Sequence, residues 1–358
     1  MTTATQPGRL RIAQIAPLWA RVPPATYGGA ELLVHWLTTA LLAQGHEVTL
    51  YATLDSTTPA RLRGVVPENL MDVMRAGRAY DYDVYALGQL AAAAREFDQF
   101  DVVHCHLGPK AIPVAAMLDK PVIHTVHEGL DGPDERWILA QFRHARIAAI
   151  SESQIAHVPP AGRDSMRVIY HGVDFTDYTF TPEPREQLVF LSRMGPRKDP
   201  VAAVRVARQI GMPIVLAGAP QDRDEKSYFE RELLPLVDGR DVVYVGELSH
   251  CEKVALLGES AALLFPIDWS EHFGIVMVES MACGTPVVAR RRGSVPEVVD
   301  NGLTGYHAER VDDLVALTER AIALDRWKVR QHAESRFSHH RMAQDYVSFY
   351  EAATGTDS

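Results

Sequence analysis

Short apolar runs alternate with amphipathic stretches along the first half of the chain. Such runs, bounded by Gly, Pro and polar residues, are typical of buried strands, whereas apolar positions at 3–4 residue spacing indicate helices. The expected strands occupy residues 10–16, 47–53, 101–106, 121–126, 146–150 and 166–170. The expected helices occupy residues 27–44, 79–97 and 134–144, with a short helix from Ser151. This order of elements predicts βαβ units.

The alternation begins again in the second half. The expected strands there occupy residues 187–191, 213–217, 242–245, 261–265 and 286–289, and the expected helices occupy 200–210, 225–237, 251–258 and 274–284. The end of the chain is expected to be helical at 311–324, 327–335 and 339–352. In the last of these helices Met342, Tyr346, Phe349 and Tyr350 form an apolar stripe, which predicts a packed face.

The pattern is interrupted between the two halves, at residues 171–174. The segment 175–186, which contains two prolines, is the best candidate for a linker. Two βαβ halves predict an α/β protein with two Rossmann-like domains that face each other across a cleft. We expect an N-terminal domain at 1–180, a C-terminal domain at 181–335 and a terminal helix within 336–358.

Composition restricts the possible partners and compartments. The 358 residues are 47% hydrophobic and 23% charged, as in ordinary globular proteins, and the net charge of −10 argues against nucleic acid as a partner. Cys105, Cys251 and Cys283 show no metal-ligand spacing, so we expect buried thiols in a reducing cytoplasm. Neither a signal peptide nor an apolar run of about 20 residues is evident, so no integral membrane segment is expected.

The stretch Ser270 to Ala289 carries the strongest chemical signal. Its expected helix, 274–284, is apolar all round except for Glu279, and a carboxylate in such a place needs a specific partner. Glu271 lies just ahead of the helix, where free backbone N–H groups offer a site for a phosphate or polar ligand. In isolation, such acids are more often a helix-start acid and a buried salt-bridge partner. The surrounding motifs favour a ligand site.

These motifs resemble the retaining family-4 glycosyltransferases, which have the GT-B fold. The resemblance rests on SEHFG at residues 270–274, the second acid, ACGTPVV at 282–288 and GSVPEVV at 293–299. It implies that Glu271 holds hydroxyls of a donor sugar and Glu279 holds the ribose of a nucleotide. The donor-binding residues expected around the helix start are Phe273, Gly274, Ile275 and Val276. The resemblance also implies that the terminal helix crosses back to the first domain.

A loop at residues 192–199 offers cations for a diphosphate. Arg193 can supply a fork of hydrogen bonds and Lys198 a compact positive charge, and the pair resembles the Arg-x4-Lys pair of the family. Arg197 competes for the same role. The family more often has Gly where Asp199 stands, a departure that could weaken phosphate binding. Cations on a loop are otherwise usually solvated.

Two features of the first half are also candidates. Gly28 and Gly29, between a strand and a helix, would let the backbone approach a donor closely, although a plain turn explains them equally well. The strand at 101–106 resembles the one that delivers its second histidine to the sugar-transfer centre of the family. This favours His106 over His104, whose side chain we expect on the opposite face of the strand. The family usually has Asn at the position of His171, so no role is assigned to it.

Together these residues predict an enzyme that transfers a hexose from a nucleoside-diphosphate sugar, with UDP-glucose as the default, to an acceptor hydroxyl with retention of configuration. The catalytic candidates are His106, Glu271, Arg193 and Lys198. We expect neither a metal nor a cofactor, and we interpret Asp81-Tyr82-Asp83 as surface rather than as a metal motif. The acceptor is expected at the loops 52–85 and 107–133. A sugar-nucleotide epimerase of the same fold and a non-catalytic sugar-nucleotide-binding protein are the alternatives.

Overall fold

The computed structural model describes residues 8–25, 28–159 and 162–355. The chain divides into two compact units. Unit 1 contains residues 1–172 and 339–358, and unit 2 contains residues 173–338. The division therefore lies at 172/173 and at 338/339, compared with the expected boundaries at 180/181 and 335/336.

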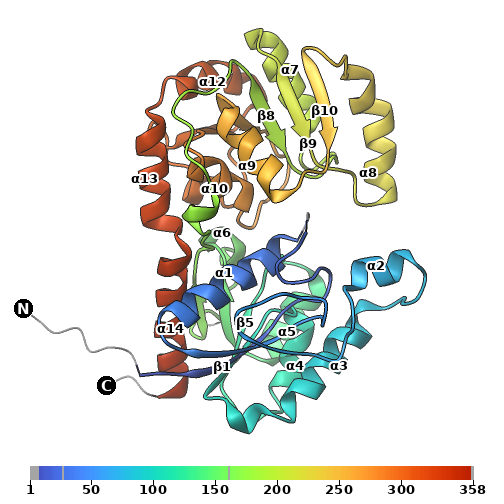
Figure 1. Ribbon diagram of the computed structural model, residues 1–358, viewed down its shortest axis with the longest axis vertical. Coiled ribbons are helices and arrows are strands. Elements are labelled where there is room, and N and C mark those ends of the chain that lie inside the picture. Colours follow the sequence, from blue (N-terminus) through green and yellow to red (C-terminus); the bar gives the residue numbers. More distant parts are fainter. Residues whose placement is uncertain (1–7, 26–27, 160–161, 356–358) are drawn as a thin grey trace, which may run out of the picture. The chain divides into compact units, whose positions relative to one another are not determined.

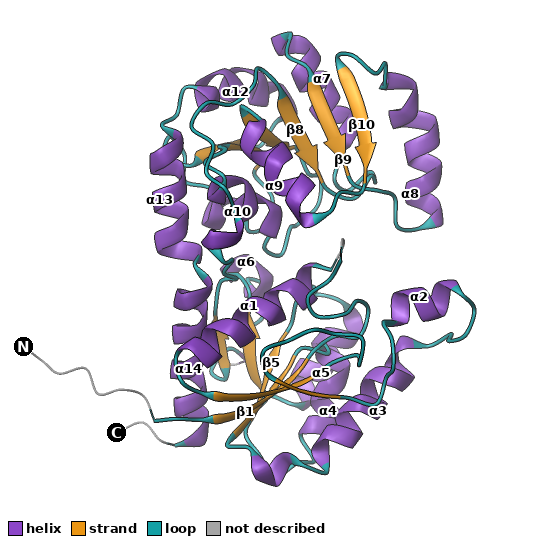
Figure 2. Ribbon diagram, in the orientation of Figure 1, coloured by secondary structure: helices purple, strands orange, loops and turns teal. Residues whose placement is uncertain are grey.

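Unit 1 is built on a sheet whose described strands are all parallel, in the order β3-β2-β1-β4-β5-β6-β7 (Figures 1 and 2). The strands are β1 (Arg11–Ile15), β2 (Glu47–Tyr51), β3 (Arg61–Arg63), β4 (Val102–Cys105), β5 (Val122–Thr125), β6 (Arg146–Ala149) and β7 (Met166–Val168). The helices are α1 (Gly29–Ala43), α2 (Leu70–Arg75), α3 (Tyr82–Ala94), α4 (Ile112–Ala115), α5 (Pro133–Gln141), α6 (Glu152–Ile155) and α14 (His339–Thr354).

The central strands of the unit 1 sheet, such as β4 and β5, are buried on both faces, which explains their largely apolar sequences. Side chains alternate along β1, so Ile12 packs with the residues of α1 and α14 while Ala13 packs with those of α3. The apolar stripe of α14 is buried in the first of these cores, where Tyr346 and Tyr350 are at most 1% exposed. The prediction that the terminal helix returns to the first domain is confirmed: α14 belongs to unit 1 and packs beside α1 (Figure 1).

Unit 2 repeats the plan with a sheet whose described strands are all parallel, in the order β10-β9-β8-β11-β12-β13. The strands are β8 (Leu188–Leu191), β9 (Ile214–Ala217), β10 (Val242–Gly246), β11 (Ala262–Phe265), β12 (Val287–Arg290) and β13 (Gly305–Ala308). The helices are α7 (Pro200–Ile210), α8 (Arg223–Tyr228), α9 (His250–Glu259), α10 (Ile275–Ala282), α11 (Val295–Val298), α12 (Leu314–Ile322) and α13 (Arg326–Phe337). The predicted pair of parallel α/β domains is thus confirmed.

One expected helix differs from the structure. The segment 225–237, expected to be one α-helix, contains the end of α8, a π-helical turn at Phe229–Leu233 and a 3₁₀ turn at Leu234–Leu236. Pro235 accounts for the irregular end, because a proline has no N–H to continue the α-helical hydrogen bonds.

The segment expected to be a linker, 175–186, lies within unit 2. Phe175 and Tyr178 are 3% and 1% exposed. The guanidinium of Arg330 on α13 donates to the carbonyl oxygens of Phe175 and Tyr178, at 2.7 Å each, and to that of Ala282 on α10. These hydrogen bonds attach the start of the segment to the helices of unit 2.

Candidate functional site

The acid pair of the sequence lies at the carboxyl end of a central strand of unit 2. β11 ends at Phe265, and the chain then passes through Glu271 to α10. Glu271 and Glu279 are only 7% and 4% exposed. Gly274 adopts a left-handed conformation (φ 73°) immediately before the helix, and a Cβ there would lie 2.7 Å from Met277 Cε. The left-handed backbone therefore favours glycine at this turn.

The glycine of the later GSVPEVV motif supports Glu271 directly. Gly293 also has a positive φ (55°), and a Cβ on it would lie 2.1 Å from the carbonyl oxygen of Glu271. The N–H of Ser294 donates to the same oxygen at 2.9 Å. The loop after β12 thus holds the backbone of Glu271 in place.

Each of the two glutamates forms an ion pair with a lysine. Lys198 Nζ donates to Glu271 Oε2, and Lys253 Nζ on α9 donates to Glu279 Oε1. Both lysine side chains are 16% exposed, and the glutamate side chains are 9% and 5% exposed. The loop lysine expected at a diphosphate and the acid expected at a sugar are therefore in direct contact.

Two residues around Glu279 were missed by the sequence analysis. Tyr178 Oη donates to Glu279 Oε1 at 2.8 Å, from the segment expected to be a linker, and Lys253 binds the same oxygen. Burial and the adjacent carboxylate raise the pKa of Tyr178 well above its ordinary value, so its hydroxyl remains a donor. The need of Glu279 for a partner was foreseeable from its apolar helix, but no spacing pointed to these two residues.

The guanidinium of Arg193 is already held by carboxylates. It donates to both oxygens of Glu225, at 2.5 and 3.2 Å, and lies 3.5 Å from Asp222. Arg197 is exposed, and its guanidinium carbon lies 5.8 Å from the centre of the Trp269 ring. In this structure Arg197 is therefore the more accessible arginine beside Lys198.

The residue that departs from the family pattern has a conformation usually reserved for glycine. Asp199 has φ 52° and ψ 57°, and it is the only non-glycine with positive φ in the described part of the chain. Its carboxylate also caps α7 by accepting from the N–H of Ala202 at 3.1 Å. The capping bond offsets part of the cost of the left-handed backbone.

The start of α10 positions the other expected donor-binding residues. Ile275 and Val276 are its first two residues, and N–H groups at this position have no acceptor within a helix. Phe273 is 2% exposed and packs edge-on against Phe337, with ring centres 5.9 Å apart. Its ring therefore belongs to the core, and only its backbone can face a ligand.

In unit 1 the glycine pair begins α1. Gly28 precedes the helix and Gly29 is its first residue. A Cβ at Gly28 would lie 2.7 Å from Pro24 Cβ, whereas a Cβ at Gly29 would meet no atom within 4 Å. Close packing accounts for Gly28, and the space at Gly29 is open.

The structure pairs His106 with a second histidine. His106 Nδ1 lies 3.1 Å from His127 Nε2, which follows the neighbouring strand β5. Burial lowers the pKa of both imidazoles, to about 4 for His127, so both are neutral near pH 7. His106 Nε2 and His127 Nδ1 have no hydrogen-bond partner among the described residues. His171 stacks on His127 with ring centres 5.2 Å apart.

The expectation that His104 points to the opposite face from His106 was wrong. Their ring centres lie 4.0 Å apart, because residues two apart on a strand share a face. His104 hydrogen-bonds Thr125 Oγ1 and Tyr350 Oη, each at 2.7 Å. It thereby ties the sheet to α14, which is a structural role.

The Asp81-Tyr82-Asp83 segment has structural partners. Asp81 caps α3, and Asp83 pairs with Lys110 at 2.5 Å. Within residues 8–25, 28–159 and 162–355, no group of three or more His, Cys, Asp or Glu side chains is arranged to hold a metal ion. In the same ranges no helix is both long and apolar enough to span a bilayer.

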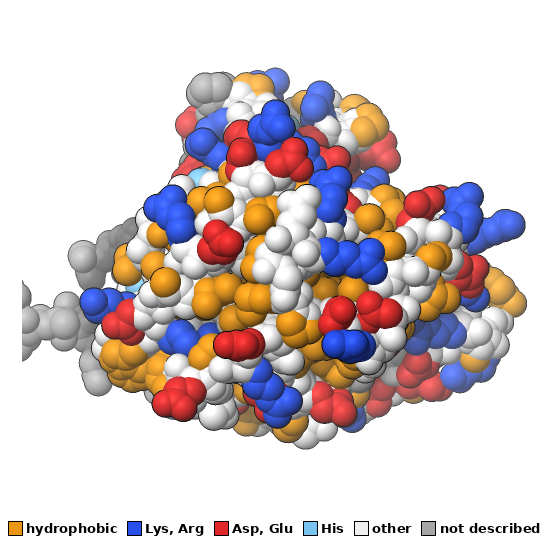
Figure 3. Space-filling view, turned by 90° about the horizontal axis from the view of Figure 1, so that it is seen from above, with side chains coloured by type: hydrophobic (Ala, Val, Ile, Leu, Met, Phe, Trp, Pro, Cys, Tyr) orange, Lys and Arg blue, Asp and Glu red, His pale blue; other side chains and the backbone are white. Residues whose placement is uncertain are grey.

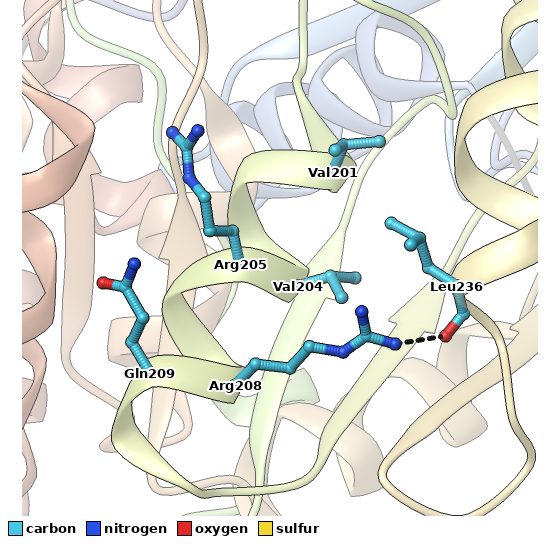
Figure 4. Close-up of a pocket in the computed structure, with 6 residues that line it drawn as sticks. All are labelled: Val201, Val204, Arg205, Arg208, Gln209 and Leu236. Carbon is cyan, nitrogen blue, oxygen red and sulfur yellow. Dashed lines mark hydrogen bonds between the residues drawn. The ribbon is translucent and has the colours of Figure 1, made fainter.

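Two surface features lie apart from these residues. A depression of about 350 Å³ on α7 is lined by Val201, Val204, Arg205, Arg208, Gln209 and Leu236, none of them a candidate (Figure 4). On the face seen in Figure 3, acidic side chains lie among Lys and Arg side chains.

Comparisons with known proteins agree with this architecture. Residues 27–177 match the model of Glycosyltransferase Family 4, and residues 177–336 match the model of Glycosyl transferases group 1. The two matches meet at residue 177, close to the division between the units at 172/173. The chain therefore belongs to the glycosyltransferases with the GT-B fold.

Individual relatives are distant, and the matches cover from 79% to nearly all of each chain. The chain is 27% identical over 331 residues to glycogen synthase of Mycobacterium tuberculosis, covering 79% of each chain. The crystal structure of AviGT4, a glycosyltransferase involved in avilamycin A biosynthesis, is 25% identical with a TM-score of 0.69, covering 97% of this chain and 98% of AviGT4. Anabaena Alr3699/HepE in complex with UDP-glucose is 17% identical with a TM-score of 0.73, covering 96% and 100%, and supports the fold alone.

Proposed function

We propose that this glycosyltransferase moves a hexose from a nucleoside-diphosphate sugar, with UDP-glucose as the default donor, to an acceptor hydroxyl with retention of configuration. The observation that carries the proposal is the pair of buried carboxylates on either side of the start of α10, each with its own lysine. A donor of this class has two sets of hydroxyls, on the ribose and on the hexose, separated by a diphosphate. Two acids flanking a helix N-terminus match that order of groups.

In this assignment Glu279 binds the ribose and Glu271 binds the hexose. Both hydrogen bonds to the Glu279 carboxylate reach Oε1, which leaves Oε2 for a ribose hydroxyl. Lys198 and the N–H groups of Ile275 and Val276 bind the diphosphate and stabilise its charge as the bond to the sugar breaks. The charge of Lys198 and the N–H dipoles together support turnover without a metal ion. Either Arg193 or Arg197 adds a second cation.

The chemical step is the one implied by a retaining transferase. The bond between the anomeric carbon and the diphosphate oxygen breaks through an oxocarbenium-like state. The acceptor oxygen then bonds to the anomeric carbon on the face that the diphosphate leaves, and the acceptor proton passes to the departing diphosphate. His106 is assigned to the sugar, since its buried Nε2 has no hydrogen-bond partner among the described residues and a hydroxyl would supply one.

The acceptor is proposed to bind the loops 52–85 and 107–133 of unit 1. The ion pair between Asp83 and Lys110 joins these two segments. No feature of them identifies the acceptor, so it has to be found by screening.

The test begins with the donor. A panel of UDP-, GDP- and ADP-sugars is screened by thermal shift and for slow hydrolysis, and the best donor is then offered to candidate acceptors. We expect stabilisation and hydrolysis with one nucleotide, undiminished in excess EDTA. Loss of activity in EDTA that Mg²⁺ or Mn²⁺ restores would refute metal independence. An altered sugar formed without any acceptor would indicate an epimerase, and binding without turnover would indicate a binding protein.

The phosphate contacts are tested by substitution. Lys198→Ala should cost about 2–4 kcal/mol of transition-state stabilisation. Arg193→Ala and Arg197→Ala, compared side by side, show which arginine contacts the diphosphate. Glu225→Gln is the matched control for Arg193, because it removes the charge of the main carboxylate partner and leaves the guanidinium in place. Unchanged turnover in all three cation variants would exclude a diphosphate at this loop.

A further inference from the structure

The indole of Trp269 contacts both Glu271, the acid proposed to bind the hexose, and Lys198, the lysine proposed to bind the diphosphate. Its Nε1–H donates to Glu271 Oε2 at 3.1 Å. Lys198 Nζ lies 4.9 Å from the centre of the indole ring and donates to the same Oε2. One carboxylate oxygen therefore receives two donors, one charged and one neutral.

The ring is held from several sides. His272 packs edge-on against it with ring centres 4.9 Å apart, and Arg197 lies 5.8 Å from its centre. Lys198 is also 5.5 Å from the ring of Phe265, at the end of β11. Because Trp269 is only partly buried, its remaining surface is open to a ligand. The indole is thus restrained to few orientations, while part of its surface stays accessible.

The arrangement matters when a diphosphate arrives. Phosphate oxygens compete with Glu271 for Lys198, since an ammonium is a compact charge that either anion can attract. A carboxylate that loses its cation next to a second anion is repelled from it. The indole N–H carries no charge and can only donate, so the phosphate charge does not draw it away as strongly.

We propose that Trp269 is a positioning residue of the donor site, which holds Glu271 toward the hexose when Lys198 turns to the diphosphate. This inference rests on the proposed function. It assigns to the indole two separable tasks: the N–H orients the carboxylate, and the ring supports the ammonium.

Two substitutions separate these tasks. Trp269→Phe keeps a ring under Lys198 and removes the N–H, whereas Trp269→Leu removes both. We expect Trp269→Phe to bind UDP within about twofold of the unmodified protein, while hydrolysis of UDP-glucose falls about tenfold. Trp269→Leu should lose the same turnover and also weaken binding of UDP. Trp327→Phe, at an exposed tryptophan of α13, is the matched control and should change neither property.

A double variant tests whether Trp269 acts through Glu271. If it does, adding Trp269→Phe to Glu271→Gln causes no further loss of turnover, because the group it orients is already altered. Losses that multiply would overturn the inference, as would unchanged turnover in Trp269→Phe. Should Trp269→Phe unfold, Trp269→Leu provides the test, since leucine also lacks a donor for Glu271, and unchanged turnover in that variant would likewise overturn the inference.

Different results would contradict the inference and the proposed function. If the unmodified protein neither binds nor hydrolyses any nucleotide sugar of the panel, the proposed function is wrong and the role of Trp269 falls with it. If the unmodified protein turns over a donor and Trp269→Phe turns it over equally well, only the role of Trp269 is wrong.

Discussion

Replacing Glu279 by Gln removes one charge from a buried ion pair at the proposed ribose site. The carboxylate accepts from Tyr178 Oη at 2.8 Å and from Lys253, whose side chain is 16% exposed. Removing one charge from a fully buried pair costs about 3–5 kcal/mol. Gln retains one acceptor oxygen and water reaches part of the lysine, so we expect a loss of about 2–3 kcal/mol in the free energy of unfolding.

The same change should weaken nucleotide binding by a separate route. A ribose hydroxyl that loses a charged acceptor loses about 1.5–3 kcal/mol, which is roughly a 10- to 150-fold rise in Kd. Calorimetry with UDP, and with GDP and ADP in parallel, measures this loss, and chemical denaturation measures stability. The double variant Lys253→Met/Glu279→Gln no longer strands a charge. It should therefore recover stability but not affinity.

Glu271→Gln is the matched comparison at the sugar end. It also leaves a lysine without its carboxylate, but its contacts to the hexose exist only with an intact donor. Affinity for UDP alone should be nearly unchanged while turnover of the sugar nucleotide falls. Equal loss of UDP affinity in Glu271→Gln and Glu279→Gln would refute the division into a sugar acid and a ribose acid. The pair would then be one structural carboxylate network.

Three further predictions concern the framework of the two units. Asp199→Ala should cost about 1–2 kcal/mol of stability, because the N-terminal cap of α7 is lost. Asp199→Gly should be at least as stable as the unmodified protein, because glycine adopts the left-handed backbone without strain. Denaturation curves that rank the two variants the other way would contradict this prediction. Gly293→Ala should lower stability by about 2 kcal/mol or more and reduce turnover, since the new Cβ would displace the backbone of Glu271. Gly88→Ala is the control and should have neither effect, because the space around Gly88 is open. Unit 1 should lose stability on acidification, because burial lowers the pKa of His124 and His127 from 6.5 to about 4. Below pH 6.5 the unfolded chain therefore takes up protons that the folded chain does not. Melting temperatures should be steady above pH 6.5 and fall toward pH 4. A melting temperature that does not change between pH 7.5 and 5 would show that these histidines are not held neutral.

The sequence by itself determined the alternation of elements and the location of the acid pair. Strand and helix periods are local properties, so short apolar runs were enough to predict two parallel α/β domains. The need for a partner at Glu279 was also local, because a single carboxylate on an apolar helix is costly unless it is paired. The short edge strand β3, RLR at residues 61–63, was missed since it has no apolar run.

Only the tertiary structure decided which side chains meet. Lys253 and Tyr178 reach Glu279 from 26 and 101 residues away, and Glu225 reaches Arg193 from 32 residues away. Periodicity indicates which face of a helix or strand is buried, but it does not indicate which residues pack against that face. The same limit applies to the segment 175–186, where two prolines suggested a linker. Its place in unit 2 depends on Arg330, whose guanidinium bonds the carbonyl oxygens of Phe175 and Tyr178 from α13, about 150 positions later in the chain.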